Sequence, residues 1–278
     1  MQRTQLQEIQ QHIEDSDAIL ITAGAGMGVD SGLPDFRGNE GFWREYPAIQ
    51  HLGLAFEEIA NPKYFTLNPP LAWAFYGHRL NLYRETTPHR GFEILLDLVK
   101  KKDDNYFIVT SNVDGQFQKA GFSHEKIVEV HGTIHHLQCS ENCTEEIWEA
   151  DKEAIEIDMQ KFEAQTIPLC KNCGNIARPN ILMFGDLSWI GDRTDAQEDR
   201  FYKWFNTLKL DGKKLTIIEL GAGKAIPTIR NYGEKFAKKS KYFKLLRINP
   251  RDFYVSQYIG WSFPYGALEG LQKIEGVK

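Results

Sequence analysis

An apolar segment near the N-terminus ends abruptly in a glycine-rich turn, and few folds accommodate that pattern. Residues 18–22 read Ala-Ile-Leu-Ile-Thr, as in a buried strand, and Gly24-Ala25-Gly26 follows almost at once. Glycines let the backbone turn sharply and approach a ligand closely, because no Cβ is in the way. The N–H groups of such a turn, at the start of a following helix, favour a phosphate. The segment therefore predicts a nucleotide site at the end of a strand.

Further apolar segments alternate with amphipathic ones along the chain. The expected strands are residues 106–111, 126–130, 215–220 and 244–248, and the expected helices are residues 4–15, 69–85, 88–101 and a closing helix from about Tyr265. Near-continuous apolar strands alternating with helices predict an α/β fold, a doubly wound parallel sheet covered on both faces. A second glycine turn, Gly221-Ala222-Gly223, follows the strand 215–220. Such sheets bind ligands at the carboxyl ends of their strands.

An ordinary dinucleotide-dependent dehydrogenase does not fit the first turn. The usual fingerprint is G-x-G-x-x-G, with an acidic residue about 20 positions later at the end of the next strand. Here Val29 occupies the last glycine position, and the next convincing strand begins only near Tyr106. The sequence therefore argues against hydride transfer.

Charge and hydropathy argue against several other classes of protein. The 33 Lys and Arg residues are outnumbered by 38 acidic ones, so the net charge is −5, whereas nucleic-acid and membrane-surface binders carry a basic footprint. No apolar run reaches the roughly 18 residues that span a bilayer, and the N-terminus lacks the apolar core of a signal peptide. We expect a cytoplasmic protein without nucleic-acid or membrane partners. Its oligomeric state stays open, and a monomer is plausible.

All four cysteines lie between positions 139 and 173. Cys139 and Cys143 are separated by three residues, and Cys170 and Cys173 by two. Pairs with this spacing bind a tetrahedral ion, and a zinc held by four thiolates has no open position for water. We therefore expect a structural Zn²⁺ rather than a catalytic one. The acidic insert between the pairs predicts a solvated helix or hairpin.

Taken in order, the motifs of this chain resemble those of the sirtuins, NAD-dependent protein deacylases. The matching stretches span nearly the whole sequence. They are Gly24-Ala25-Gly26, Pro34-Asp35-Phe36-Arg37-Gly38, Thr110-Ser111-Asn112-Val113-Asp114-Gly115, Val130-His131-Gly132, the cysteine pairs, Arg178 to Asp186, Gly221-Ala222-Gly223 and Ile248-Asn249.

The resemblance implies two structural units. The larger, Rossmann-like NAD-binding domain would comprise residues 1–36, 86–133 and 179–278. The smaller domain would comprise two insertions, a helical one at 37–85 and a four-cysteine zinc module at 134–178.

The resemblance also implies roles for individual residues. His131 would be the general base, with Asn112 and Asp114 lining the nicotinamide pocket; a histidine suits this task because its pKa lies near neutrality. The acyl-lysine oxygen of a protein substrate would attack C1′ of the NAD ribose as nicotinamide leaves. The implied cofactor-binding residues are Gly24, Ala25, Gly26, Asp35, Phe36, Arg37, Ser111, Asn112, Val113, Asp114, Gly221, Ala222, Gly223 and Asn249. Met183, Phe184 and Gly185 would pair with the substrate peptide as an added strand.

Simpler interpretations exist for several of these residues. His131 could be a core histidine at a strand end, with His135 and His136 marking the entry to the zinc module. Asn112 and Asp114 could be ordinary turn residues, since Asn-x-Asp-Gly is common turn chemistry. Arg37 could be a surface charge, and the segment from Met183 a loop rim.

Tyr76 and Arg79 bear on the acyl group. They lie three residues apart on the expected helix 69–85 and so share a face. A phenol beside a guanidinium can hold a carboxylate, and the pair resembles that of sirtuins that remove succinyl, malonyl or glutaryl groups. The alternative is a core tyrosine beside a surface arginine, and acetyl-lysine stays possible.

Four positions depart from the family pattern and keep other functions open. Gly28 replaces a serine, Ser111 a glutamine, and Ala222-Gly223 a Thr-Ser pair. Each hydroxyl lost from the cofactor contacts removes roughly 0.5–1.5 kcal/mol. The alternatives are protein ADP-ribosyl transfer or NAD hydrolysis on the same scaffold, and an NAD or ADP-ribose sensor without turnover.

Overall fold

A computed structural model describes residues 3–34, 46–47 and 53–276 of the chain. In this part, a six-stranded sheet has the order β11-β10-β9-β1-β2-β3, and every neighbouring pair is parallel. The strands are β1 (Ala18–Ala23), β2 (Tyr106–Thr110), β3 (Ile127–Glu129), β9 (Leu215–Leu220), β10 (Phe243–Ile248) and β11 (Gly260–Phe263). The expected doubly wound parallel sheet is therefore confirmed.

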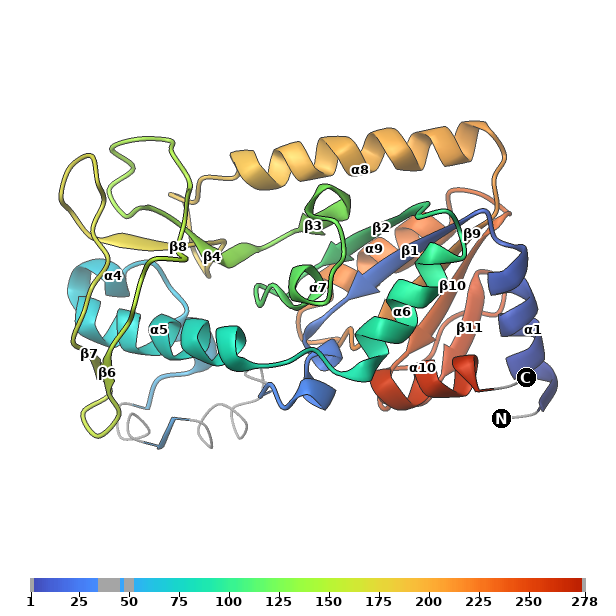
Figure 1. The fold of residues 1–278 in the computed structure, drawn as a ribbon, viewed down its shortest axis with the longest axis horizontal. Coiled ribbons are helices and arrows are strands. Elements are labelled where there is room, and N and C mark those ends of the chain that lie inside the picture. The colour runs from blue at the N-terminus through green and yellow to red at the C-terminus, as the bar shows by residue number, and fades with distance from the viewer. Residues whose placement is uncertain (1–2, 35–45, 48–52, 277–278) are drawn as a thin grey trace.

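Helices cover both faces of this sheet (Figure 1). On one face lie α1 (Arg3–Asp15), α6 (Arg90–Lys100), the short α7 (Gln116–Lys119) and α10 (Ala267–Glu275). On the other lie α8 (Asp192–Leu210) and α9 (Thr228–Ala237). Ile19, Ile21 and Ala23 of β1 face the first helical layer, while Ala18 and Leu20 face the second, because successive strand residues point to opposite faces.

A smaller unit lies at the left of Figure 1, where α5 (Pro69–Glu85) packs beside small antiparallel sheets. One sheet has the order β5-β4-β8, and β6 pairs with β7. Their bounds are β4 (Gly132–Cys139), β5 (Trp148–Glu149), β6 (Ile157–Asp158), β7 (Glu163–Ala164) and β8 (Ala177–Ile181), with α3 (Phe56–Ile59) and α4 (Tyr64–Leu67) nearby. Trp73 anchors α5 by donating its indole N–H to the Ala177 carbonyl at 2.9 Å.

The core of the smaller unit includes Ile181 and Met183. The implied domain boundary between residues 178 and 179 lies within β8, which pairs with β4 with a shift in register. The acidic insert contains β5 and leads into the β6–β7 hairpin, with no helix between residues 145 and 156. After the first glycine turn the chain forms two 3₁₀ turns, Ala25–Met27 and Val29–Ser31.

The topology places a ligand site beside β1. The chain winds from β1 to β2 and β3 on one side, and from β9 to β10 and β11 on the other. The carboxyl ends of β1 and β9 are thus neighbours at the point where the strand order reverses, which is where doubly wound sheets bind ligands. Both glycine turns lie there.

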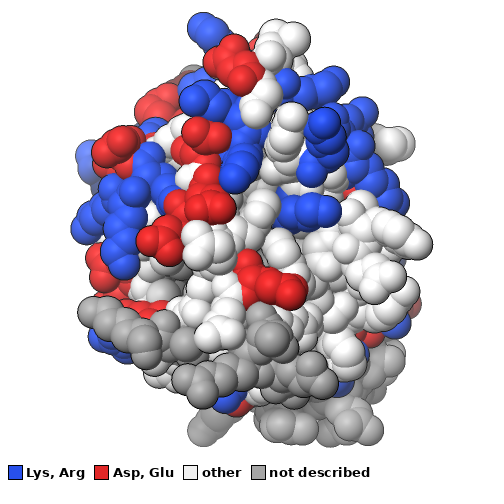
Figure 2. All heavy atoms as spheres, turned by 90° about the vertical axis from the view of Figure 1, so that its right-hand side faces the viewer, with Lys and Arg blue, Asp and Glu red and all other residues white. Residues whose placement is uncertain are grey.

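No helix in the described ranges is long and apolar enough to cross a membrane. Figure 2 shows the face at the right of Figure 1, where Lys and Arg gather towards the top and acidic side chains lie among and beside them. Ion pairs such as Lys213–Asp17 and Lys214–Asp15 form at 3.4 and 3.6 Å.

Candidate functional site

The two glycine turns pack against each other through their backbones. The Gly24 N–H donates to the Leu220 carbonyl at 3.0 Å, and the Gly26 N–H to the Gly221 carbonyl at 3.1 Å. A Cβ on Gly26 would lie 2.7 Å from the Gly221 Cα, closer than side chains tolerate. Glycine at these positions is therefore required by the contact between the turns.

Polar side chains form hydrogen bonds to the backbone of the second glycine turn. The Ala222 carbonyl accepts bonds from Asn249 Nδ2 at 3.0 Å and Arg230 Nη1 at 3.2 Å. Asn249 Oδ1 accepts the N–H groups of Arg251 and Asp252. Asn249 therefore joins the loops that follow β9 and β10, so its side chain holds the turn in shape.

Gly28, one of the departures from the family pattern, lies against the Leu33 side chain. A Cβ there would lie 2.9 Å from Leu33 Cδ1, and Leu33 is buried in the smaller unit's core. A serine here would require the end of the Leu33 side chain to shift.

A cavity of about 270 Å³ opens between the two units, and it collects most of the predicted catalytic and substrate residues. Its lining includes Ala25, Tyr76, Arg79, Ser111, Asn112, Val113, Asp114, His131, Met183 and Phe184. Gly185 and the second glycine turn do not line it, although Ile226 shortly after that turn does. Asp35, Phe36 and Arg37 lie outside the described residues.

The side-chain amide of Asn112 is held by a hydrogen bond from its nitrogen but not by one to its oxygen. Its Nδ2 donates to the Gly24 carbonyl at 3.1 Å, and its N–H donates to Thr110 Oγ1 at 3.0 Å. Its Oδ1 is buried and has no hydrogen-bond partner within the described ranges. Because an unsatisfied buried acceptor costs about 1–3 kcal/mol, this oxygen is available to a donor on a bound ligand.

Asp114 is a buried carboxyl group on the same loop. Burial raises its pKa to about 6, and the nearby charge of Glu129 adds to the effect while Arg79 opposes it. One of its oxygens accepts the Gln116 N–H at 3.0 Å. A carboxyl group whose pKa is this close to neutrality can exchange a proton or accept a ligand hydrogen bond under ordinary conditions.

His131 follows β3 and is half-buried at the cavity wall. Its carbonyl accepts the Leu182 N–H at 3.0 Å, which brings the segment after β8 alongside it. His135 and His136 lie on β4 and line a different cavity. Burial lowers the pKa of both, to about 4 for His136. His131 therefore lies at a different cavity from His135 and His136.

The segment from Met183 to Asp186 forms a turn rather than a strand. The Met183 N–H donates to Asp186 Oδ2 at 3.3 Å, and the Phe184 N–H to the Ala60 carbonyl at 3.0 Å. These donors are already engaged, so strand addition by a peptide at this edge depends on the remaining backbone groups.

Tyr76 and Arg79 both line the cavity and are both buried. Arg79 is therefore not the surface charge of the simpler interpretation. Its Nε and Nη2 donate to Tyr83 Oη at 3.1 and 2.9 Å, and its guanidinium lies 5.2 Å from the Phe75 ring centroid. Burial raises the pKa of Tyr76, so its phenol keeps its proton and can donate.

Tyr83 lines the same cavity but was not among the predicted residues. The signal for it was present, because Tyr76, Arg79 and Tyr83 follow an i, i+3, i+7 pattern on α5 that places all three on one helix face.

The four cysteines form one cluster. Their Sγ atoms all lie within 4.8 Å of one another, and the Cys139–Cys173 and Cys143–Cys170 separations are both 3.6 Å. A tetrahedral ion with Zn–S bonds of 2.3 Å requires sulfur separations of about 3.8 Å. The cluster fits a structural zinc, and these distances are far too long for disulfides.

The chain is similar to known proteins along most of its length. Residues 24–200 match the Sir2 family. An NAD-dependent protein deacylase of Aquifex aeolicus is 28% identical over 257 residues, which cover 92% of this chain and 93% of that protein. An NAD-dependent protein deacylase of Leptospira interrogans is 33% identical over 178 residues, 64% of each chain.

Solved structures share the fold. A crystal structure of a Sir2 homolog–NAD complex has a TM-score of 0.72 at 21% identity and covers 97% of this chain and 93% of its own. A structure described as the structural basis of sirtuin substrate affinity has a TM-score of 0.68 at 20% identity and covers 99% of both.

Proposed function

The chain belongs to the Sir2 family, and we infer from this membership that it is an NAD-dependent protein deacylase. The observation that carries the inference is that one cavity brings Asn112, Asp114 and His131 together next to Ala25 of the first glycine turn. Acyl-lysine side chains of proteins are the substrates that such an enzyme takes.

The residues present fit NAD. Ala25 of the first glycine turn lines the cavity, where a turn that follows a strand suits a pyrophosphate, and the unpartnered Asn112 Oδ1 suits a carboxamide N–H. When bound, NAD supplies a ribose carbon with a good leaving group, nicotinamide. We propose that Asn112 and Asp114 orient the nicotinamide end, and that Asn249 keeps the second turn in a binding conformation.

His131 is the proposed general base. It lies in the wall of the cavity, and a neutral imidazole can accept a proton from a ribose hydroxyl near pH 7. Zinc takes no part in this chemistry, because four thiolates fill its coordination sphere. Metal-binding thiols favour a reducing compartment, so the cytoplasm remains the expected location.

We propose further that the acyl group is acidic. Tyr76 and Arg79 present a phenol O–H and a guanidinium on one side of an otherwise largely apolar cavity, and together they can bind a carboxylate. Succinyl-lysine and malonyl-lysine would place a carboxylate there, whereas acetyl-lysine would place a methyl group.

The test is nicotinamide release from NAD by the purified protein with acetyl-lysine peptide, succinyl-lysine peptide or no peptide, repeated with His131→Ala. Release that requires an acyl peptide and disappears in the variant supports deacylation. Release without peptide would instead indicate NAD hydrolysis or transfer to another acceptor. NAD binding without release would indicate a sensor. The sensor is the second candidate function because Ala222-Gly223 replaces the usual Thr-Ser pair in the second glycine turn.

A further inference from the structure

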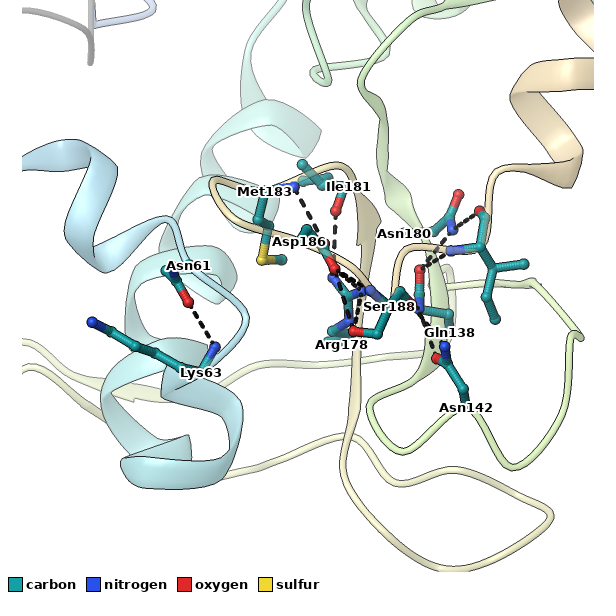
Figure 3. A network of polar contacts seen from close by, with 11 residues as sticks. Asn61, Lys63, Gln138, Asn142, Arg178, Asn180, Ile181, Met183, Asp186 and Ser188 are labelled. Carbon is teal, nitrogen blue, oxygen red and sulfur yellow. Dashed lines mark hydrogen bonds and ion pairs between the residues drawn. The ribbon is translucent and has the colours of Figure 1, made fainter.

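A buried ion pair holds the turn that forms one wall of the cavity (Figure 3). Arg178 on β8 donates through Nη1 to Asp186 Oδ2 at 2.8 Å and through Nη2 to Asp186 Oδ1 at 3.0 Å. The two side chains are 1% and 0% exposed. A bidentate pair of this kind fixes the orientation of both partners.

The Asp186 carboxylate also organises the backbone on either side of it. Oδ2 accepts the Met183 N–H at 3.3 Å, and Oδ1 accepts the Ser188 N–H at 3.1 Å. Arg178 Nη1 additionally reaches the Ile181 carbonyl at 3.4 Å. Ile181 and Met183 both line the cavity, so one ion pair sets the path of the chain that forms this wall.

The same network continues to Gln138 and Asn142 (Figure 3). The Ser188 carbonyl accepts bonds from Gln138 Nε2 at 2.8 Å and Asn142 Nδ2 at 3.0 Å. Gln138 and Asn142 directly precede Cys139 and Cys143. The cavity wall is therefore connected by hydrogen bonds to the segments that carry Cys139 and Cys143.

A buried salt bridge contributes little net stability, because desolvation offsets the attraction between its charges. Its geometric effect is different, since removing it frees the groups that it orients. We propose that Arg178 and Asp186 are a positioning pair, whose function is to hold the wall at Ile181 and Met183 where the acyl-lysine side chain enters. This proposal rests on the proposed deacylase function.

The test uses the double substitution Arg178→Met/Asp186→Leu. It leaves no unpaired buried charge, and such apolar replacements are often tolerated or stabilising. The matched control is Arg247→Met/Glu219→Leu, since that pair is equally buried but joins β10 to β9 away from the cavity. Far-UV circular dichroism and a cooperative thermal transition check that each variant is folded.

The measurements are the affinity for a fluorescently labelled acyl-lysine peptide, the affinity for NAD, and kcat and KM for nicotinamide release. We expect peptide affinity to fall by about tenfold or more, and KM to rise with it, because small misplacements near a reacting group are costly. NAD affinity should change by less than about twofold, and the control should bind peptide like the wild type.

Wild-type peptide affinity in the folded Arg178→Met/Asp186→Leu variant would overturn the positioning role alone. An equal loss in the control would overturn it too, by showing a general effect of removing a buried pair. A wild-type protein that neither binds acyl peptide nor releases nicotinamide with it would overturn the proposed function as well.

Discussion

A Cβ on Gly221 would lie 2.3 Å from the carbonyl carbon of Gly26, although nearly 200 residues separate the two in sequence. Gly221 also has φ of +61°, a conformation that side chains rarely adopt. The two glycine turns therefore form one interlocked backbone structure, and a change in either alters both.

Gly221→Ala should lower the free energy of unfolding by at least about 2 kcal/mol, through the left-handed backbone and the clash with the first turn. Gly223→Ala is the matched control for stability, because a Cβ there has no neighbour within 4 Å. Urea denaturation compares the two. Equal stability of both variants would show that the turns can separate without cost.

Asp114→Asn should stabilise the protein near neutral pH. Its native pKa is raised to about 6 from an ordinary value of 3.8, so ionisation disfavours the folded state. Stability therefore falls as pH rises from about 4 to about 6, by up to about 3 kcal/mol in total, and stays lower above that range. The variant removes this loss.

Urea melts of Asp114→Asn and wild type between pH 4 and 8 check this prediction. Their difference should be small at pH 4 and largest at pH 7. A difference that does not depend on pH would contradict a raised pKa. Because the same carboxyl group lines the cavity, the more stable variant should also release nicotinamide more slowly.

Arg79→Met should reverse a preference for acidic acyl groups. Losing a charge-assisted hydrogen bond should lower kcat/KM for succinyl-lysine peptide by about tenfold to a hundredfold, while acetyl-lysine peptide changes little. Tyr76→Phe, which removes only the hydroxyl, should give a smaller effect in the same direction. Equal losses for both peptides would indicate that Arg79 has a structural role only.

Metal removal should unfold the smaller unit. We expect about one zinc per chain, released by a thiol-modifying reagent and detected with a metallochromic dye, and a lower melting temperature after release. Cys143→Ser should bind zinc more weakly. Full metal content in that variant would contradict the four-cysteine site.

The strands that precede the glycine turns could be predicted because their burial on both faces leaves a nearly continuous run of apolar residues, as in β1 and β9. The cysteine cluster was predictable for a related reason, since thiolate spacing is set by local turns. The face shared by Tyr76 and Arg79 followed from helical periodicity alone.

Other elements could not be predicted from the sequence, because the residues that they contact are distant along the chain. The strand β8 contains Arg178, Pro179 and Asn180, and only its pairing with β4 explains why these residues are buried. The ion pair of Arg178 with Asp186 has no sequence signature beyond two opposite charges. Helix α8 is a different case. Its buried residues Gln197, Phe201, Phe205 and Leu208 recur at helical spacing in the sequence, yet no helix is predicted there.

The pairing of β1 with β9 has a kinetic consequence. The first glycine turn is synthesised early, yet its Gly24 N–H bonds to the Leu220 carbonyl, which emerges from the ribosome only after most of the chain. Contacts of such long sequence separation form slowly, and domains complete folding only when their last elements are available. Nucleotide affinity should therefore arise late in biogenesis, so that a nascent chain or a C-terminal truncation cannot capture the cofactor prematurely.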